Sequence, residues 1–84
     1  MKKIIMYTTE WCRDCVDAKK FLKERGIPFD EVNIDNNPHA AAIVMKLNNG
    51  MRMVPMLNVE GTIVSGDSFN PKRFENDLRE AGVL

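Results

Sequence analysis

The 84-residue sequence has only two cysteines and one histidine, and it has no excess of charge of either sign. A secreted domain of this length that relied on disulfides for stability would usually carry four or more cysteines. Lys+Arg and Asp+Glu both number 12, so the chain lacks the basic excess that binds nucleic acid or an anionic membrane surface. We therefore expect a soluble globular protein that binds neither nucleic acid nor membrane.

Long hydrophobic runs are also missing. Residues 1–6 begin like a signal peptide, with lysines before apolar residues, but the apolar run stops at Tyr7 and Glu10 follows. That run is shorter than the apolar region of a signal peptide, and no other run is long enough to span a bilayer. We expect a buried first strand here, a cytoplasmic location and a single domain over residues 1–84.

The first half of the chain has the pattern of a strand, a helix and a second strand. Residues 3–8 are rich in β-formers and apolar on both faces, as in a central strand. Apolar residues recur at helical spacing over residues 16–22, and Gly26 and Pro28 end that helix. The second strand is predicted through Phe29, Val32 and Ile34.

The second half contains two helices with the same start signal. Residues 37–38 and 70–71 are Asn-Pro pairs, in which Asn caps the helix and Pro takes its first position. Between these helices, residues 54–59 predict a third strand, residues 60–61 a two-residue hairpin turn, and residues 62–65 a fourth strand. The apolar residues expected to face the core are Ala40, Ile43, Val44 and Leu47 in the first helix, and Phe74, Leu78 and Ala81 in the second.

The predicted order is therefore β-α-β-α-β-β-α. The first β-α-β unit requires parallel strands joined by a right-handed crossover, and the second half adds a hairpin backed by a helix. We predict an α/β fold with a four-stranded mixed sheet of order 2-1-3-4 and helices on both faces. A thioredoxin-like domain has this topology.

Cys12 and Cys15 lie where the first strand gives way to the first helix. Free backbone N–H groups and the helix dipole stabilise an anion at that end, which lowers the pKa of a thiol there. Cys15 follows one helical turn later, close enough to attack a mixed disulfide formed at Cys12. We predict that Cys12 is the attacking thiol and Cys15 the resolving thiol.

The neighbouring charges have opposite effects, and another chemistry is available to the cysteines. Arg13 favours the thiolate, whereas Asp14 and Glu10 oppose it, so the sequence does not give the sign of their net effect. Two cysteines and His39, which belongs to a different predicted helix, are one ligand short of a structural zinc site. We favour redox chemistry over metal binding, with no metal ligand assigned, because the pair lies in a βαβ context.

Residues 7–15 (YTTEWCRDC), together with residues 52–55 (RMVP), resemble the glutaredoxins over nearly the whole chain. Within that family, the mycoredoxin and NrdH-redoxin branch is most similar. The resemblance implies that Pro55 is a cis proline facing the cysteine pair, which leaves the Val54 backbone free to pair with a substrate segment. We predict that Trp11, Val54 and Pro55 frame the groove in which the substrate docks, and that Arg13 is a further substrate-binding residue.

The resemblance further implies a binding site for glutathione. Arg52 would contact one carboxylate, and the backbone amides of Asp67 and Ser68 would bind the other. The sequence departs from the family at Thr9, where many members have Lys, at residues 13–14, often Pro-Tyr, and at residues 65–66, often Gly-Gly. The loss of a cation and an aromatic and the gain of Asp14 predict weaker binding of an anionic thiol.

We therefore expect a monomeric dithiol oxidoreductase of electron transport and cell redox homeostasis, with no bound cofactor. Its substrates would be protein disulfides or mixed disulfides of low-molecular-weight thiols. Its electron donor would be glutathione, another such thiol or thioredoxin reductase. Two alternatives stay open: a protein that handles metal or iron–sulfur clusters, and a non-catalytic interaction module.

Overall fold

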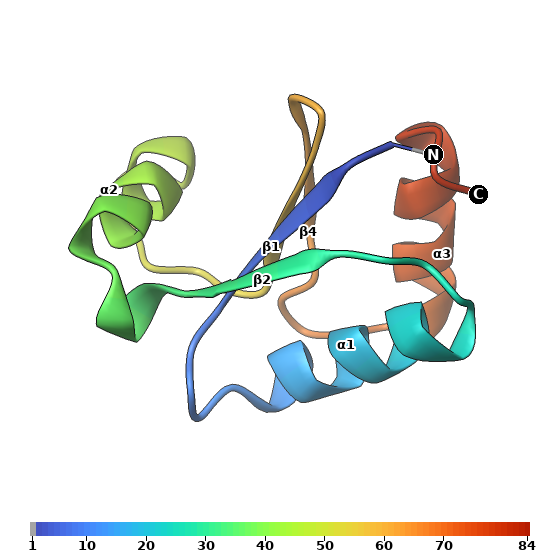
Figure 1. Cartoon of the computed structure of the whole chain (residues 1–84), viewed down its shortest axis with the longest axis horizontal. Helices are drawn as coiled ribbons and strands as arrows, with labels where there is room; N and C mark the ends of the chain where they lie inside the picture. The colour runs from blue at the N-terminus through green and yellow to red at the C-terminus, as the bar shows by residue number, and fades with distance from the viewer. Residues whose placement is uncertain (1) are drawn as a thin grey trace.

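The computed structural model describes residues 2–84, so Met1, the first residue of the N-terminal run, lies outside the described residues. Four strands, three α-helices and one 3₁₀ helix follow one another along the chain (Figure 1). Their bounds are β1 Ile4–Thr8, α1 Arg13–Glu24, β2 Asp30–Asn33, η1 Ile34–Asn36, α2 Pro38–Leu47, β3 Met56–Val59, β4 Thr62–Ser65 and α3 Pro71–Glu80.

The four strands form one mixed sheet in the order β2-β1-β3-β4. β1 pairs parallel with β2 and antiparallel with β3, and β4 pairs antiparallel with β3. Both the predicted strand order and the central place of the first strand are confirmed. The parallel pair follows from the crossover through α1, because a strand, a helix and a second strand in sequence return in the same direction.

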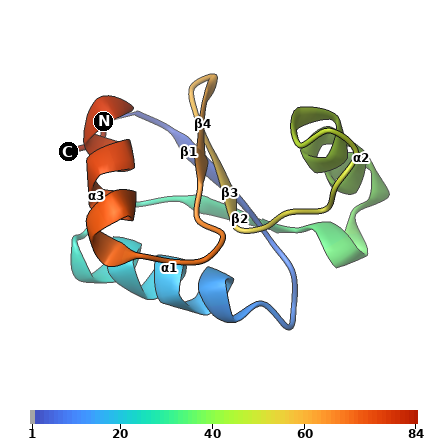
Figure 2. The ribbon, with the colours of Figure 1, turned by 180° about the vertical axis from the view of Figure 1, so that it is seen from behind.

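The helices cover both faces of the sheet. α1 and α3 lie together on one face and α2 lies on the other, an arrangement that is clear from both sides of the molecule (Figures 1 and 2). Each face has its own apolar cluster, so β1 is buried on both sides. The first cluster includes Ile4, Met6, Phe21, Leu22, Leu57, Phe74 and Leu78. The second includes Tyr7, Ile34, Ala40, Val44 and Met56.

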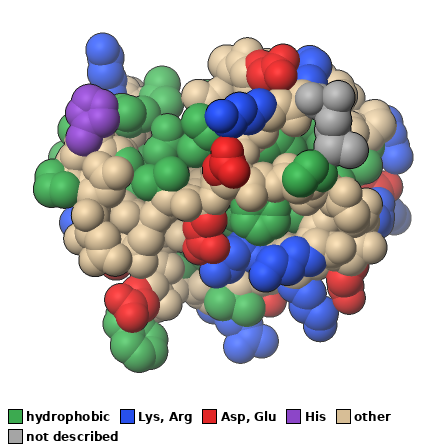
Figure 3. All heavy atoms as spheres, in the orientation of Figure 1, with side chains coloured by type: hydrophobic (Ala, Val, Ile, Leu, Met, Phe, Trp, Pro, Cys, Tyr) green, Lys and Arg blue, Asp and Glu red, His purple; other side chains and the backbone are tan. Residues whose placement is uncertain are grey.

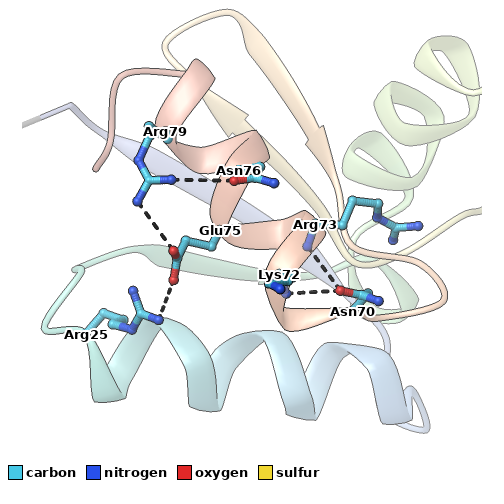
Figure 4. A network of polar contacts seen from close by, with 7 residues as sticks. All are labelled: Arg25, Asn70, Lys72, Arg73, Glu75, Asn76 and Arg79. Atoms are coloured by element: carbon cyan, nitrogen blue, oxygen red, sulfur yellow. Dashed lines mark hydrogen bonds and ion pairs between the residues drawn. The ribbon is translucent and has the colours of Figure 1, made fainter.

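Both predicted helix starts are confirmed. The Asn37 Oδ1 atom accepts a hydrogen bond from the Ala40 amide at 3.0 Å, and Pro38 is the first residue of α2. Asn70 Oδ1 accepts from the amides of Lys72 and Arg73 at 3.0 and 3.1 Å (Figure 4). Each Asn therefore satisfies amides that have no partner within the helix.

Several details of the predicted elements are wrong. β2 begins at Asp30, so Phe29 lies before the strand and not in it. Ile34 begins η1 and is not part of β2, because Asn33 Oδ1 accepts from the Asp35 amide at 2.9 Å and turns the chain. The third strand begins at Met56 and not at residue 54, since Pro55 has no N–H to donate to a neighbouring strand. Leu47 is 48% exposed, because it is the last residue of α2 and lies beyond the buried residues of that helix.

Candidate redox site

Cys12 and Cys15 are joined in a disulfide, with 5.1 Å between their Cα atoms. Cys12 is the N-cap of α1, and its Sγ accepts a hydrogen bond from the Cys15 amide at 3.0 Å. The side chain of Cys15 is buried, with 1% of its surface exposed, whereas Cys12 is partly exposed. An incoming sulfur can therefore reach Cys12 more easily than Cys15, and the amide aimed at the Cys12 sulfur can stabilise negative charge on it.

The strand end that leads to the cysteines is fixed by a buried hydroxyl. Thr8 is buried, and its Oγ1 donates to the Glu31 carboxylate at 2.8 Å, while Lys19 Nζ donates to the same oxygen at 3.0 Å. Burial raises the pKa of Glu31, but the hydrogen bonds from Lys19 and Thr8 outweigh it and lower that pKa below its ordinary value. This contact ties β1 and β2 to α1 just before the site.

The peptide bond between Val54 and Pro55 is cis, which confirms what the resemblance implied. The Val54 carbonyl oxygen lies 3.8 Å from the Cys12 sulfur, so this bond is next to the reactive pair. Behind it, the Gly66 amide donates to the Pro55 carbonyl at 2.9 Å. A Cβ atom on Gly66 would come within 2.7 Å of the Pro55 ring, so the close approach requires glycine.

The surface around the disulfide is partly apolar. Trp11, which precedes Cys12, is 94% exposed, and Val16, which follows Cys15, is also exposed. Figure 3 shows hydrophobic atoms projecting at the end of the molecule where the β1–α1 loop lies. Arg13 is exposed too, and its Nε lies 3.6 Å from Asp17. Substrate contacts by Trp11, Arg13 and the 54–55 segment stay predictions.

Arg52, which the resemblance assigned to a carboxylate of glutathione, is already paired with a carboxylate of the chain. Its Nη2 atom lies 3.2 Å from Asp35 Oδ1. The other oxygen of Asp35 accepts from the Glu10 amide at 3.3 Å. Asp35 thus links the loop before Cys12 to the segment before Pro55, and sequence reasoning gave it no role.

One amide of the predicted glutathione-binding pair, that of Ser68, already has an acceptor within the chain, and the assignment of Asp67 and Ser68 to glutathione stays a prediction. The amides that converge are those of Ser68 and Phe69, where the prediction named Asp67 and Ser68. They donate to the two carboxylate oxygens of Asp14 at 2.9 and 3.1 Å. Sequence reasoning treated Asp14 only as a charge near Cys12. No local pattern indicates the contact, because Asp14 and the Ser68 amide are 54 positions apart in the sequence.

The loop that presents these amides is held by its own contacts. The Arg73 guanidinium donates to the carbonyls of Asp67 and Ser68 at 2.6 and 3.2 Å. The Ser65 hydroxyl donates to the Asp67 carboxylate. Ser68 has a φ of 51°, in the left-handed region that a serine seldom adopts. The amides therefore have a defined direction.

Two kinds of feature are absent from residues 2–84. No group of three or more His, Cys, Asp or Glu residues lies together in a way that would hold a metal ion. No helix in this part of the chain has the length and apolar character needed to cross a membrane.

Comparison with known proteins agrees with this geometry. The family model for glutaredoxin matches residues 4–64. A glutaredoxin of Pseudomonas aeruginosa is 33% identical over 66 residues, which cover 79% of this chain and 77% of that protein. The glutaredoxin-like protein NrdH of Lactococcus lactis subsp. lactis is 33% identical over 63 residues, covering 75% and 85%.

Solved structures include the same kind of protein. NrdH-redoxin from Escherichia coli, described as glutaredoxin-like, superposes with a TM-score of 0.71 at 28% identity, covering 88% of this chain and 92% of that one. The matched segment contains both cysteines and the cis proline, the residues that form the centre of the site. On the strength of the family model and the two relatives, this chain belongs to the glutaredoxin family.

Proposed function

We propose that the protein is a dithiol oxidoreductase that reduces protein disulfides or mixed disulfides of low-molecular-weight thiols. The observation that carries this proposal is the disulfide between a partly exposed Cys12 and a buried Cys15 at the start of α1. A disulfide at this place would stabilise the folded protein little, because the two cysteines that it joins are only three positions apart in the sequence. The pair is better suited to repeated opening and closing.

The reduced protein begins the reaction as a dithiol. The Cys12 thiolate attacks one sulfur of the substrate disulfide; that S–S bond breaks, a bond between Cys12 and the attacked sulfur forms, and the departing sulfur takes up a proton. The Cys15 thiolate then attacks Cys12, which forms the Cys12–Cys15 disulfide and releases the second substrate sulfur, which takes up a proton as a thiol. Two electrons pass from the protein to the substrate, which leaves the oxidised state that the structure contains.

Substrate docking is proposed at the edge formed by Trp11, Val54 and Pro55. Val54 precedes β3 and is not part of the sheet, so its backbone is suited to pair with an extended substrate segment. The exposed indole of Trp11 adds apolar area that a protein surface would cover on binding. We expect protein disulfides to use this edge more fully than a small thiol does.

The electron donor that restores the dithiol is proposed to be glutathione, another low-molecular-weight thiol or thioredoxin reductase, in the cytoplasm. The Escherichia coli NrdH-redoxin is described as having a thioredoxin-like activity profile, which makes a reductase a reasonable donor to try first. Oxidised protein is offered glutathione with its reductase, and separately thioredoxin reductase with NADPH. The rate at which free thiols appear identifies the donor.

The test of the function uses insulin disulfide reduction with dithiothreitol as the electron source. Cys12→Ser is expected to lower the rate to that of dithiothreitol alone, because no attacking sulfur is left. His39→Ala, on the exposed start of α2, is the control and is expected to keep the full rate. Activity that survives in Cys12→Ser, or a wild-type rate no higher than dithiothreitol alone, contradicts the proposal.

A further inference from the structure

The Asp14 carboxylate is held like a bound ligand. Its two oxygens accept separate hydrogen bonds from two consecutive amides, Ser68 at 2.9 Å and Phe69 at 3.1 Å. Consecutive backbone N–H groups that point to one spot form an anion-binding concavity, and hydrogen bonds to a charged acceptor are about twice as strong as neutral ones. The chain therefore supplies its own anion to a site suited to one.

The loop that carries these two amides has contacts besides those to Asp14. The Arg73 guanidinium donates to the carbonyls of Asp67 and Ser68, and Ser68 has a φ of 51° in the left-handed region. Asn70 then caps α3 directly after the loop (Figure 4). Without the Asp14 carboxylate the two amides would lose their acceptor.

The occupied amides belong to the redox site. Asp14 lies between the two cysteines, and the loop that carries the amides is bonded to Pro55 through the Gly66 amide at 2.9 Å. The neighbouring Val54 carbonyl is 3.8 Å from the Cys12 sulfur. A small thiol that brought its sulfur to Cys12 would thus have its other groups close to this loop.

We propose that Asp14 is a specificity-determining residue, a tethered carboxylate that excludes thiols carrying carboxylates of their own. Asp14 accepts the hydrogen bonds of the Ser68 and Phe69 amides, which such a thiol would use for its own carboxylate. It also adds a fixed negative charge beside the disulfide. Neutral thiols and protein disulfides do not need those donors and are not repelled. The inference rests on the proposed function, because it concerns which thiols exchange with the Cys12–Cys15 pair.

A second carboxylate strengthens the same effect. Arg52, another donor suited to an anionic ligand, is paired with Asp35 at 3.2 Å. Both of these side chains are about half exposed, with 50% and 41% of their surfaces accessible, so solvent weakens the pair and it opens readily. Asp14, bonded to fixed backbone amides, is the larger obstacle.

The kinetic test measures the reduction of oxidised protein by glutathione and by uncharged 2-mercaptoethanol. The quantity compared is the glutathione ratio, the second-order rate constant with glutathione divided by that with 2-mercaptoethanol. General effects of a substitution on the disulfide cancel in this ratio. Asp14→Ala is expected to raise the glutathione ratio about tenfold, the loss of one charged hydrogen-bonded competitor. Asp14→Asn, which removes the charge but keeps an oxygen for the amides, is expected to raise it about threefold.

Glu10→Gln is the matched control for charge. Glu10 and Asp14 lie two residues on either side of Cys12, but only Asp14 bonds the amide pair. The control is expected to leave the ratio within a factor of two. An unchanged ratio in Asp14→Ala overturns the proposal, and so does an equal rise in Glu10→Gln. Should Asp14→Ala fail to fold, Asp14→Asn decides, and the absence of a rise in that variant overturns the proposal.

A binding test separates this inference from the proposed function. S-methylglutathione carries the carboxylates of glutathione but no thiol, so it binds without reacting. In ¹⁵N NMR spectra, it is expected to shift the Ser68 and Phe69 amide signals of Asp14→Ala and to leave those of the wild type unmoved. Equal shifts in both proteins, or none in the variant, overturn the inference even if the exchange activity is confirmed. The expected shifts would support it even if that activity were absent.

Discussion

Helix α1 is joined to the C-terminal part of the chain by a carboxylate at each of its ends, and the two junctions differ in kind. At its start, Asp14 accepts hydrogen bonds from the Ser68 and Phe69 amides. At its end, Arg25 donates to Glu75 of α3 at 2.5 Å, and Arg79 donates to the same carboxylate at 3.4 Å (Figure 4). Only the first junction lies beside reactive sulfur.

The difference lies in the partner groups. Backbone amides have a fixed direction and lose little entropy when they bind, whereas Arg25 and Arg79 are long side chains with about half of their surface exposed. The hydrogen bond and charge of Arg25, followed by those of Arg79, lower the pKa of Glu75 below its ordinary value. The junction at the end of α1, between Arg25 and Glu75, thus adds modest, salt-sensitive stability. The junction at its start, through Asp14, lies beside the cysteines and can affect thiol exchange.

An apolar layer connects the two ends. Phe21 of α1 and Phe74 of α3 meet edge to face with 5.3 Å between ring centroids, and Phe69 packs on both. Phe69 thus has its side chain against this layer and its amide on Asp14. The direction of the amides is therefore set by the same packing that holds the helices together.

The largest effect is expected at the near end, from Gly66→Ala. The new Cβ would lie 2.7 Å from the Pro55 ring, which cannot rotate away, so the loop must move. We expect a loss of about 1 to 3 kcal/mol in the free energy of unfolding, measured with urea, and a lower rate of insulin reduction. A variant with wild-type stability and rate would show that the loop and Pro55 need no such close contact.

A smaller effect is expected from Asn70→Ala, at the start of α3. Loss of the cap should lower the free energy of unfolding by about 1 kcal/mol and shift the amide signals of Ser68 and Phe69. Asn37→Ala removes the same kind of cap from α2, on the opposite face of the sheet, and serves as the matched control. It should cost similar stability without moving those signals, and equal shifts in both variants would contradict a local link to the site.

The smallest effect is expected at the far end, from Glu75→Gln. The folded pKa of Glu75 lies below its ordinary value of 4.5, so its stabilising contribution is complete above that pH and disappears as the pH falls through the folded pKa. The variant should therefore be slightly less stable than the wild type at pH 7 and equal to it in strong acid, with unchanged thiol selectivity. If the difference in stability between the variant and the wild type grew as the pH fell, the assigned lowering of the Glu75 pKa would be wrong.

Local signals made most of the fold predictable. The two Asn-Pro starts and the Glu60-Gly61 turn depend on neighbours in sequence, and each matches the structure. Hydrophobic spacing predicted the helices, although Leu47 of α2 is exposed. The place of the cysteine pair at the start of α1 was predictable for the same reason. The end of β2 was not, because a single side-chain bond from Asn33 decides it.

Contacts between distant residues were beyond the sequence. Asp14 and the Ser68 amide are 54 positions apart, and only the packing of α1 against α3 brings them together. The pairing of Arg52 with Asp35 is also set by the fold and not by a local pattern. The resemblance assigned carboxylate binding to this loop, which stays a prediction, and nothing in the pattern indicated that the Asp14 carboxylate occupies its Ser68 and Phe69 amides.

The central claim is that the outer sulfur attacks and the inner sulfur resolves, and trapping the intermediate tests it most directly. Reduced Cys15→Ser is mixed with a peptide that carries a disulfide, and the products are weighed by mass spectrometry. A stable mixed disulfide between Cys12 and one sulfur of the peptide is the expected result, because the variant lacks the Cys15 sulfur that would release it. If Cys12→Ser forms the adduct and Cys15→Ser does not, the assignment of the two sulfurs is wrong.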